Sequence, residues 1–406
     1  MLKKLIIAAA GAAFMIGVSE SVQAADFTVL ADGLNSPRHL AFGPDGALYV
    51  TEAGKGGTGV CISSPSAGGE KLCYGNTGAV TRIQNGTTKR VVTGLPSLAL
   101  PDGRDANGAH DLAFDSTGKA YILFGLAGDQ KEGGSELINS DLGKLVSIDF
   151  LNGGTQREQL VDFSAFEGLQ NPDGGDLASN PYAFLIKDNK AFVIDAAGND
   201  LLQVGTDGSE LGVYALFDQR LVPFEDSDFP LQSVPTSIKI GPDGAFYVGE
   251  LTGFPYPKNA ARVYRINGNQ PEVYAEGFTN IIDFDFDSAD NLYVLEYATN
   301  SILSGDPTGA LIRVAPDGTR TMIASEGLIS PTSLSISSDD AIYIANNGFI
   351  AGQGEVIRIE PTAVPEPSYM TYILGSLFWM LSVRFRNYYT KRNQLKPEIT
   401  RGTLKV

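Results

Sequence analysis

Short runs of alternating apolar and polar residues recur along most of the chain, and they come in pairs around tight turns. The first pair covers residues 40–50 on either side of Pro44-Asp45-Gly46. This pattern predicts a β-hairpin, because alternate side chains of a strand face opposite sides of its sheet. It returns five times, at 112–122, 184–193, 238–248, 284–294 and 334–344.

A third apolar run follows each hairpin, and a fourth follows in most units. Third runs include 79–83, 262–266, 311–314 and 356–359, and fourth runs include 90–95 and 321–324. Units of four short strands that repeat around a chain are typical of propellers. We therefore predict an all-β fold, a six-bladed β-propeller with four-stranded blades over residues 26–361.

The last repeat lacks its fourth strand, and the first repeat is preceded by a strand without a unit of its own. The sixth unit stops at Ile359, whereas residues 27–34 match the fourth-strand segment 273–278. If residues 27–34 pair with the third strand of the sixth unit, that strand no longer leaves an open edge of the sheet. We predict that the N-terminal strand closes the ring as the outer strand of blade six.

Both ends of the chain look like targeting segments. Lys3 and Lys4 precede an apolar run and a small-residue cleavage pattern, which predicts a signal helix, a secretory signal peptide over 1–24, and export through the Sec machinery. Near the other end, a Pro-rich linker at 362–368 leads into an apolar run at 369–383 and a basic tail at 384–406. We predict a transmembrane helix with a cytoplasmic tail, which leaves the body in the periplasm or at the cell surface.

The C-terminal segments resemble the PEP-CTERM sorting signal. The resemblance rests on Pro365-Glu366-Pro367, the following apolar run and the terminal basic residues. It implies that an exosortase is a partner and that the helix anchors the protein to the membrane unless it is processed.

Composition excludes several classes of function. The chain has 406 residues, 30 Lys and Arg against 47 Asp and Glu, and a formal charge of −17, so nucleic acid is not an expected partner. Two histidines and two cysteines leave no zinc-binding pattern. In an exported protein Cys61 and Cys73 should form a disulfide. We expect a monomer.

One mouth of the ring should carry the function. The start of each first strand and the end of each second strand lie at the same mouth, and all long insertions fall there, at 53–77, 125–142, 251–260 and 297–308 and in the connections 96–108, 163–180 and 216–233. Binding residues commonly sit on such loops. The residues predicted to face a ligand at this acidic mouth are Arg38, Glu52, Tyr182, Asp195, Glu250, Asp283 and Glu296.

Three interpretations of these side chains remain open. Glu52, Glu250, Asp283 and Glu296 could bind Ca²⁺, the one cofactor that the sequence suggests. His39, His110 and Asp111 could transfer protons in a catalytic site. The carboxylates could instead cap strand ends and pair with Arg38, Arg104 or Arg262. No nucleophile elbow, phosphate-binding loop or nucleotide fingerprint decides between an enzyme and a binding protein.

Longer strings resemble the ScyD/ScyE family of propellers, named for gene clusters that make the indole–phenolic sunscreen scytonemin in cyanobacteria. They lie at 36–38, 42–54, 95–98, 110–111, 171–175, 179–182, 234–237 and 249–255. The resemblance covers residues 26–360 and implies an NHL-like propeller in the envelope that handles an aromatic small molecule in a late step of such a synthesis. The alternative is a surface module that binds polysaccharide or protein without catalysis.

Overall fold

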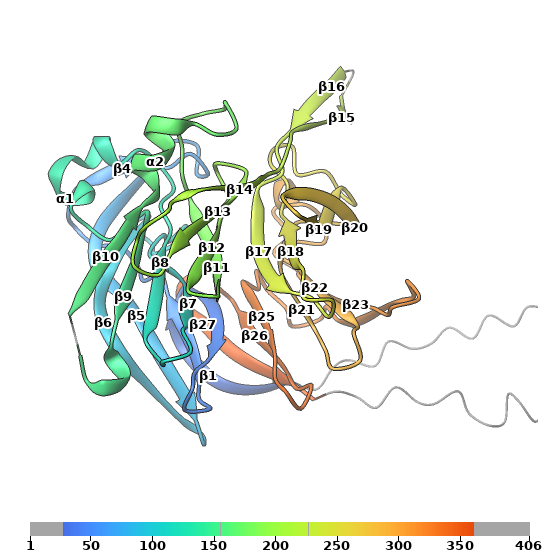
Figure 1. Cartoon of the computed structure of the whole chain (residues 1–406), viewed down its shortest axis with the longest axis horizontal. Coiled ribbons are helices and arrows are strands. Elements are labelled where there is room, and N and C mark those ends of the chain that lie inside the picture. Colours follow the sequence, from blue (N-terminus) through green and yellow to red (C-terminus); the bar gives the residue numbers. More distant parts are fainter. Residues whose placement is uncertain (1–26, 155, 226, 361–406) are drawn as a thin grey trace, which may run out of the picture. The chain divides into compact units, whose positions relative to one another are not determined.

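The computed structural model describes residues 27–360 except 155 and 226, and in this part of the chain six antiparallel sheets form the blades of a ring (Figure 1). Five of these sheets have four strands, and that of blade one has a fifth, the short insertion strand β4 (Cys61–Ser63). From the innermost strand outward, the blades are β2 (Pro37–Phe42), β3 (Leu48–Glu52), β5 (Lys71–Gln84) and β6 (Thr87–Ala99); β7 (Ala109–Phe114), β8 (Ala120–Phe124), β9 (Lys144–Ile148) and β10 (Arg157–Asp162); β11 (Pro181–Lys187), β12 (Lys190–Asp195), β13 (Asp200–Gly205) and β14 (Gly212–Leu216); β17 (Pro235–Ile240), β18 (Phe246–Glu250), β19 (Ala261–Asn267) and β20 (Gln270–Phe278); β21 (Ile281–Phe286), β22 (Leu292–Glu296), β23 (Ala310–Val314) and β24 (Arg320–Ala324); and β25 (Ser333–Ile336), β26 (Ile342–Asn346), β27 (Ala351–Ile359) and β1 (Phe27–Asn35). The innermost strands contact one another in ring order, and β25 returns to β2. The prediction of a six-bladed β-propeller is confirmed.

The N-terminal strand closes blade six as predicted. β1 pairs antiparallel with β27, and Phe27 lies opposite Ile359. Leu34 and Ala31 bury their side chains in an apolar cluster that joins this blade to blade one. The last strand of the ring is therefore covered by the first strand of the domain.

Hairpin turns between the first and second strands are built by aspartate and glycine. The carboxylate of Asp45 accepts a hydrogen bond from the Ala47 amide at 3.2 Å, and Asp243 repeats this contact with the Ala245 amide at 3.1 Å. Gly46 and Gly244 have φ values of 71° and 78°, which glycine adopts without steric cost. The connections at this mouth of the ring are therefore short turns, and the long connections lie at the opposite mouth.

Apolar packing lies mainly between the blades. Each of six buried clusters spans two neighbouring blades, and together they form a closed circle of interfaces. A seventh cluster lies under the insertions of blades one and two. Because each blade buries both faces of its sheet, the ring is a rigid scaffold for the loops at its mouth.

The insertions carry most of the remaining elements. They are β4 (Cys61–Ser63), the 3-10 turns η1 (Gln130–Gly133) and η3 (Ile302–Ser304), the helices α1 (Gly134–Ile138) and α2 (Phe163–Gln170), and the hairpin of β15 (Arg220–Phe224) and β16 (Ser227–Leu231). The 3-10 turn η2 (Phe150–Asn152) instead lies in the connection between β9 and β10, outside the insertions. In Figure 1, β4, α1, α2 and the projecting β15–β16 hairpin all lie toward the top of the view. The prediction that long insertions share one mouth holds for these elements.

The predicted signal peptide at 1–24, the linker at 362–368, the helix at 369–383 and the tail at 384–406 lie outside the described residues. Within residues 27–360, none of the helices has the length and apolar character that crossing a bilayer requires.

Candidate functional site

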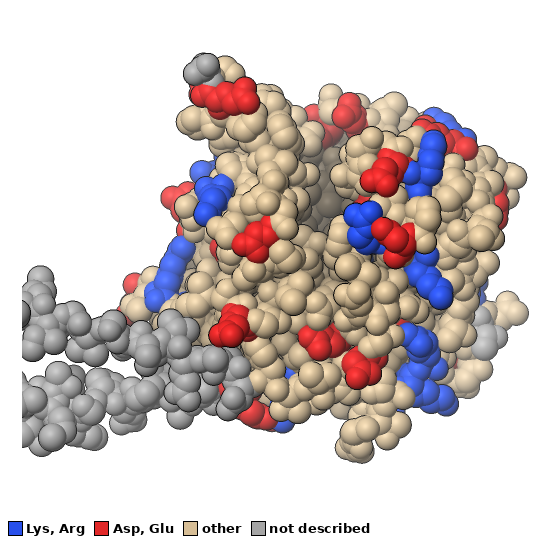
Figure 2. Space-filling view, turned by 180° about the vertical axis from the view of Figure 1, so that it is seen from behind, with Lys and Arg blue, Asp and Glu red and all other residues tan. Residues whose placement is uncertain are grey.

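A cleft of about 640 Å³ opens at the mouth that carries the insertions. Figure 2 shows this face hollowed beside the projecting hairpin. The floor of the cleft is formed near the starts of first strands and just after second strands, by Arg38, His110, Tyr182, Leu251, Ile282 and Tyr297. Of the predicted mouth residues, Arg38, His110 and Tyr182 line this cleft.

Arg38 brings a positive charge into the cleft. One of its Nη atoms donates a hydrogen bond to the carbonyl of Ala106. Its buried Nε has no hydrogen-bond partner among the described residues. A buried donor without an acceptor costs free energy, so this guanidinium is ready to meet an acceptor that a ligand supplies.

His110 presents the complementary group. Its side chain is buried, with only 3% exposed, and Nδ1 lies 3.3 Å from the carbonyl oxygen of Pro181. A carbonyl oxygen only accepts, so Nδ1 carries the proton and Nε2 keeps a free lone pair. Nε2 has no partner within the described part of the chain. The imidazole of this cleft residue therefore has an unused hydrogen-bond acceptor beneath the cleft surface.

Burial also sets the charge of this imidazole. Loss of hydration, with the nearby positive charge of Arg38, lowers the pKa of His110 to about 3, although the Pro181 carbonyl raises it. A base with so low a pKa accepts a proton poorly near neutral pH. His110 is thus suited to orienting a ligand as a neutral acceptor, and the predicted role in proton transfer has no support from its surroundings.

The position of the His110 ring depends on Gly125. A Cβ atom built on Gly125 would lie 2.0 Å from two atoms of the ring. We expect Gly125→Ala to push the imidazole away from Pro181 and to lower the free energy of unfolding by about 2 kcal/mol, as overpacking does. Urea unfolding measures this loss. Gly168→Ala is the control, because its Cβ would meet no atom within 4 Å; equal stabilities of the two variants would contradict the prediction.

His39 and Asp111 meet in the centre of the ring. His39 Nε2 lies 3.3 Å from Asp111 Oδ1, and Nδ1 lies 3.9 Å from Asp283 Oδ2. Asp111 is held by the amides of Leu112 at 2.6 Å and Phe184 at 2.7 Å. Burial lowers the pKa of His39 to about 4, although Asp111 raises it. Asp111 thus ties two neighbouring blades together.

The three residues predicted as a proton-transfer group are therefore divided. His39 and Asp111 face each other, whereas the His110 side chain lines the cleft. His39 and Asp111 do not line it. A single catalytic group of three does not form among these side chains.

Lys239 joins the same central cluster. Its Nζ lies 3.7 Å from Asp283 Oδ1, and Asp283 also accepts hydrogen bonds from Ser333 Oγ at 2.9 Å and the Leu334 amide at 2.8 Å. Although burial disfavours its charged form, the surrounding aspartates raise the pKa of Lys239. This ion pair joins the innermost strand of blade four, which carries Lys239, to that of blade five, which carries Asp283.

The acids at the ends of second strands cap the segments before the first strands. Glu52 accepts from the Asn35 amide at 2.8 Å, Asp195 from the Asn180 amide at 2.7 Å and Glu296 from the Thr279 amide at 2.7 Å. In addition, Arg90 bonds Glu52, and Arg220 bonds Glu250 through two nitrogens. The capping contacts agree with the third interpretation. The arginine partners differ from those expected, because Arg38, Arg104 and Arg262 bond Ala106, Asp102 and Glu276 instead.

The four predicted calcium ligands, Glu52, Glu250, Asp283 and Glu296, have separate partners in three blades. None of them lines the cleft. Within the described residues, no three His, Cys, Asp or Glu side chains are grouped as a metal site. Calcium at these four residues stays a prediction without a geometric basis. The cleft at this mouth has side chains of both charges in its lining, Arg38 and Arg104 together with Glu70 and Asp105.

Sequence reasoning missed Tyr297, Leu251 and Ile282. Tyr297 and Leu251 directly follow the capping acids Glu296 and Glu250 in the repeat. The repeat alignment could have found them, because the residue after each capping acid is carried to the same mouth. Burial raises the pKa of Tyr182 to about 12, so the phenol keeps its proton.

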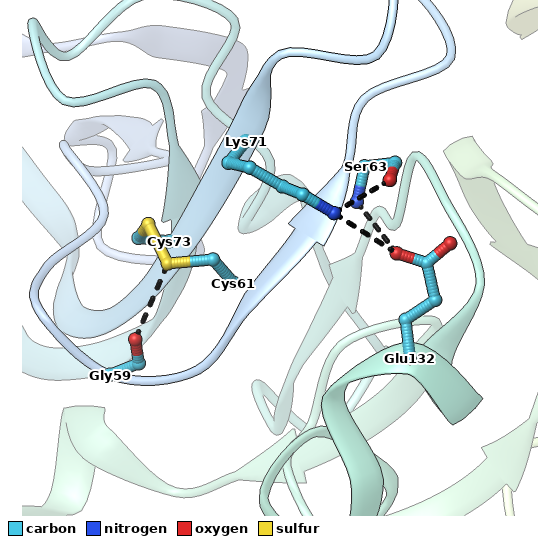
Figure 3. The surroundings of a disulfide bond; sticks show 6 residues. All are labelled: Gly59, Cys61, Ser63, Lys71, Cys73 and Glu132. Atoms are coloured by element: carbon cyan, nitrogen blue, oxygen red, sulfur yellow. Dashed lines mark hydrogen bonds and ion pairs between the residues drawn. A yellow bond between two sulfur atoms is a disulfide. The ribbon is translucent and has the colours of Figure 1, made fainter.

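A disulfide supports one wall of the cleft. Cys61 and Cys73 join β4 to β5, as predicted. Figure 3 shows Lys71 and Ser63 of this hairpin beside Glu132 of η1; Lys71 Nζ lies 3.8 Å from Glu132 Oε2, and the Ser63 amide donates to that oxygen at 2.9 Å. Ile62 and Leu72 pack on the blade-two insertion. The two insertions are thereby fastened into one wall.

Comparisons with known proteins show the fold. No protein-family model matches the chain, and no curated protein is similar to it in sequence. Among solved structures, a putative oxidoreductase (glucose dehydrogenase) from Thermus thermophilus is 15% identical with a TM-score of 0.52 over 83% of this chain and 100% of that one. The soluble aldose sugar dehydrogenase of Escherichia coli is 13% identical with a TM-score of 0.50, over 83% and 99%. A Bacteroides thetaiotaomicron protein of unknown function is 9% identical with a TM-score of 0.51, over 83% and 72%. At these identities the likeness establishes a shared six-bladed propeller and nothing finer.

Proposed function

We propose that the protein binds a small aromatic molecule in the cleft, with an acidic group of the ligand on Arg38 and a hydroxyl or N–H of the ligand on His110. The observation that carries this is that two residues of the cleft lining, Arg38 and His110, each have a buried atom without a hydrogen-bond partner among the described residues, Arg38 Nε and His110 Nε2. One is a cationic donor and the other a neutral acceptor. Tyr182 and Tyr297 add aromatic rings beside them, which suits a planar ligand.

The proposal extends to where the protein acts. Disulfides such as Cys61–Cys73 persist in oxidising compartments, and the sequence of the N-terminal segment has the pattern of a signal peptide. We propose that the protein is exported to the cell envelope and that its PEP-CTERM-like C-terminal segment anchors or sorts it there. The ScyD/ScyE resemblance suggests a late extracytoplasmic step in the synthesis of an aromatic secondary metabolite.

The alternative, a surface module for polysaccharide or protein, is less favoured by the cleft. A volume of about 640 Å³ lies in the range of small-molecule sites. The polar contacts available on its floor are few and convergent. An extended polymer would need a longer row of such groups.

Calorimetry with defined probes tests the proposal. 4-Hydroxyphenylacetate and indole-3-acetate carry both a carboxylate and a donor, whereas 4-methoxyphenylacetate lacks the donor and phenol lacks the carboxylate. We expect the first two to bind most tightly. Arg38→Met should weaken them about 10- to 100-fold, as loss of a charged hydrogen bond does, and should leave phenol unchanged.

Arg262→Met serves as the control variant, because Arg262 pairs with Glu276 and does not line the cleft. His110→Phe should weaken 4-hydroxyphenylacetate and spare 4-methoxyphenylacetate. Equal affinities of wild type and Arg38→Met for both carboxylates would overturn the proposal. Binding of an oligosaccharide in place of these probes would favour the surface module.

A further inference from the structure

Two buried carboxylates between blades two and three each have an oxygen without a partner. Glu167 on α2 is 3% exposed and Asp200 at the start of β13 is 1% exposed. Glu167 Oε1 and Asp200 Oδ1 are fully covered and accept no hydrogen bond from the described residues. The other fully buried acids all accept at least one: Glu52, Asp111, Asp195, Glu250, Asp283 and Glu296. A buried carboxylate in this condition is either neutral or bound to a cation.

These two acids lie in an unusually acidic neighbourhood. Asp200 is directly opposite Asp195 in the pairing of β12 with β13. A Cβ atom built on Gly198, in the turn that joins them, would lie 3.4 Å from Asp195 Cγ and 3.5 Å from Glu167 Oε2. Asp173 is attached to the same turn through Asn199 Nδ2, at 2.9 Å. Four acids therefore surround a turn of four residues.

No positive side chain relieves this repulsion in the described structure. None of its ion pairs includes any of the four acids, since the cations of this region pair elsewhere: Lys144 with Asp162, Arg157 with Asp141, Lys190 with Glu210 and Arg220 with Glu250. Burial and the neighbouring acids Asp195 and Asp173 raise the pKa of Glu167 to about 7, and burial raises that of Asp200. Like charges placed this close favour a bound counter-ion.

The available ligands are all oxygens. Besides the free carboxylate oxygens, the amide oxygen of Asn171 is buried without a partner among the described residues, one helical turn after Glu167. Carboxylate and amide oxygens suit Ca²⁺, which accepts six to eight of them in flexible geometry, whereas Mg²⁺ demands a regular octahedron. Only two carboxylates have uncommitted buried oxygens here. Because no three acids, histidines or cysteines are grouped as a metal site in the described residues, these two carboxylates would be the charged ligands and neutral oxygens would supply the rest.

We propose that Glu167 and Asp200 bind a Ca²⁺ ion between α2 and the β12–β13 turn, with neutral oxygens such as that of Asn171 completing its coordination. The site is distinct from the cleft, although it adjoins one cleft wall. Asp195 holds Ser179 and Asn180, and these two residues and Ala197 line the cleft. We therefore expect bound Ca²⁺ to make that wall more rigid. The Ca²⁺ site itself does not depend on which ligand binds in the cleft.

Calorimetric titration of the full chain with CaCl₂, after removal of metal by a chelator, tests the site. We expect one saturable Ca²⁺ per chain and a higher melting temperature with Ca²⁺ than with chelator. MgCl₂ should bind much more weakly. The double variant Glu167→Gln with Asp200→Asn should lose at least about 100-fold in Ca²⁺ affinity, because ligand charge sets the strength of such sites. Its melting temperature should not respond to Ca²⁺.

The control is Asp141→Asn, which removes an acid that is paired with Arg157 and has no part in either site, and should keep Ca²⁺ binding intact. If the double variant does not fold, Asp200→Asn alone should still weaken the binding. Absence of saturable binding by the wild type up to about 10 mM Ca²⁺, beyond the weakest protein sites, would overturn the proposal. Equal binding by wild type and the double variant would also overturn it.

A pH series without metal separates protonation from metal binding. Because the pKa of Glu167 is higher in the folded chain than its ordinary value of 4.5, the native state retains its proton longer than the unfolded state. The contribution of Glu167 to stability is therefore fully present below about pH 4.5 and is lost as the pH rises through about 7. We expect Ca²⁺ to restore the lost stability at pH 8 in the wild type. A pH-dependent loss that Ca²⁺ does not repair would show that the pair is only protonated and would reject the site.

Discussion

Removal of the N-terminal strand is expected to prevent cooperative folding of the propeller. Without β1, the edge of β27 loses its partner, and the cluster between blades six and one loses Ala31 and Leu34. β1 also supports blade one, because the Asn35 amide bonds Glu52 and the Gly33 carbonyl accepts from Arg90. A chain that starts at Ser36 should therefore aggregate or unfold without a sharp transition, as judged by circular dichroism and urea titration.

A smaller change in the same strand makes the prediction quantitative. Leu34 is 2% exposed, so Leu34→Ala should lower the free energy of unfolding by about 3 kcal/mol through lost burial and a cavity. Val29 on the same strand is 52% exposed, and Val29→Ala should cost less than about 0.5 kcal/mol. Matching urea midpoints for the truncated and intact chains would show that β1 does not close the ring.

Replacement of Lys239 by methionine is expected to lower the free energy of unfolding by about 3 to 5 kcal/mol. The methionine would fill the space but leave Asp283, whose side chain is 2% exposed, without its ammonium partner. Removal of one member of a buried ion pair is costly because the remaining charge keeps its desolvation penalty. Urea unfolding at pH 7 gives the free energy.

Two comparisons isolate the buried charge. Lys258→Met removes an exposed lysine that bonds Asn300 and should change stability by less than about 1 kcal/mol. Burial raises the pKa of Asp283, so the penalty in Lys239→Met should shrink at lower pH as this acid takes up a proton. If Lys239→Met and Lys258→Met are equally stable at pH 7, the central ion pair contributes nothing to the fold.

The fold was readable from the sequence because each unit repeats the same local rule. The turn at Asp45 and Gly46 is set by a side-chain hydrogen bond and a positive φ within a few residues, and alternation defines the strands on either side. The closing strand was also readable, because residues 27–34 carry a fourth-strand pattern without a blade of their own. These features are set by residues that lie close together in the sequence, so a local pattern is enough to predict them.

The site was readable only in part, and the reason lies in the starts of the first strands. Pairing shifts register between Pro37 and Leu40 in blade one and between Ala109 and Asp111 in blade two. A bulge breaks the period of two, so alternation does not reveal whether Arg38 or His39 reaches the cleft. The repeat position predicted that Arg38, His110 and Tyr182 reach this mouth. It did not predict that His110 lines the cleft while the neighbouring Asp111 faces His39 in the centre of the ring.

The partners of Glu52 and the lack of a partner for Glu167 could not be predicted from the sequence for a different reason. Glu52 accepts hydrogen bonds from an amide 17 residues away and an arginine 38 residues away. Glu167 is brought near Asp195 and the β12–β13 turn by the packing of α2. The sequence does not distinguish a carboxylate that has hydrogen-bond partners from one that has none. The distinction depends on how the loops pack in the folded chain.

The pairing of β1 with β27 constrains the order of events during synthesis. Phe27 leaves the ribosome early, but its partner Ile359 belongs to the last strand of the ring. Blades one to five can acquire their four strands as they emerge, whereas the sixth must wait for the whole domain. Until then the first strand needs protection from other strand edges, so a nascent chain stalled before residue 351 should be the species that chaperones hold.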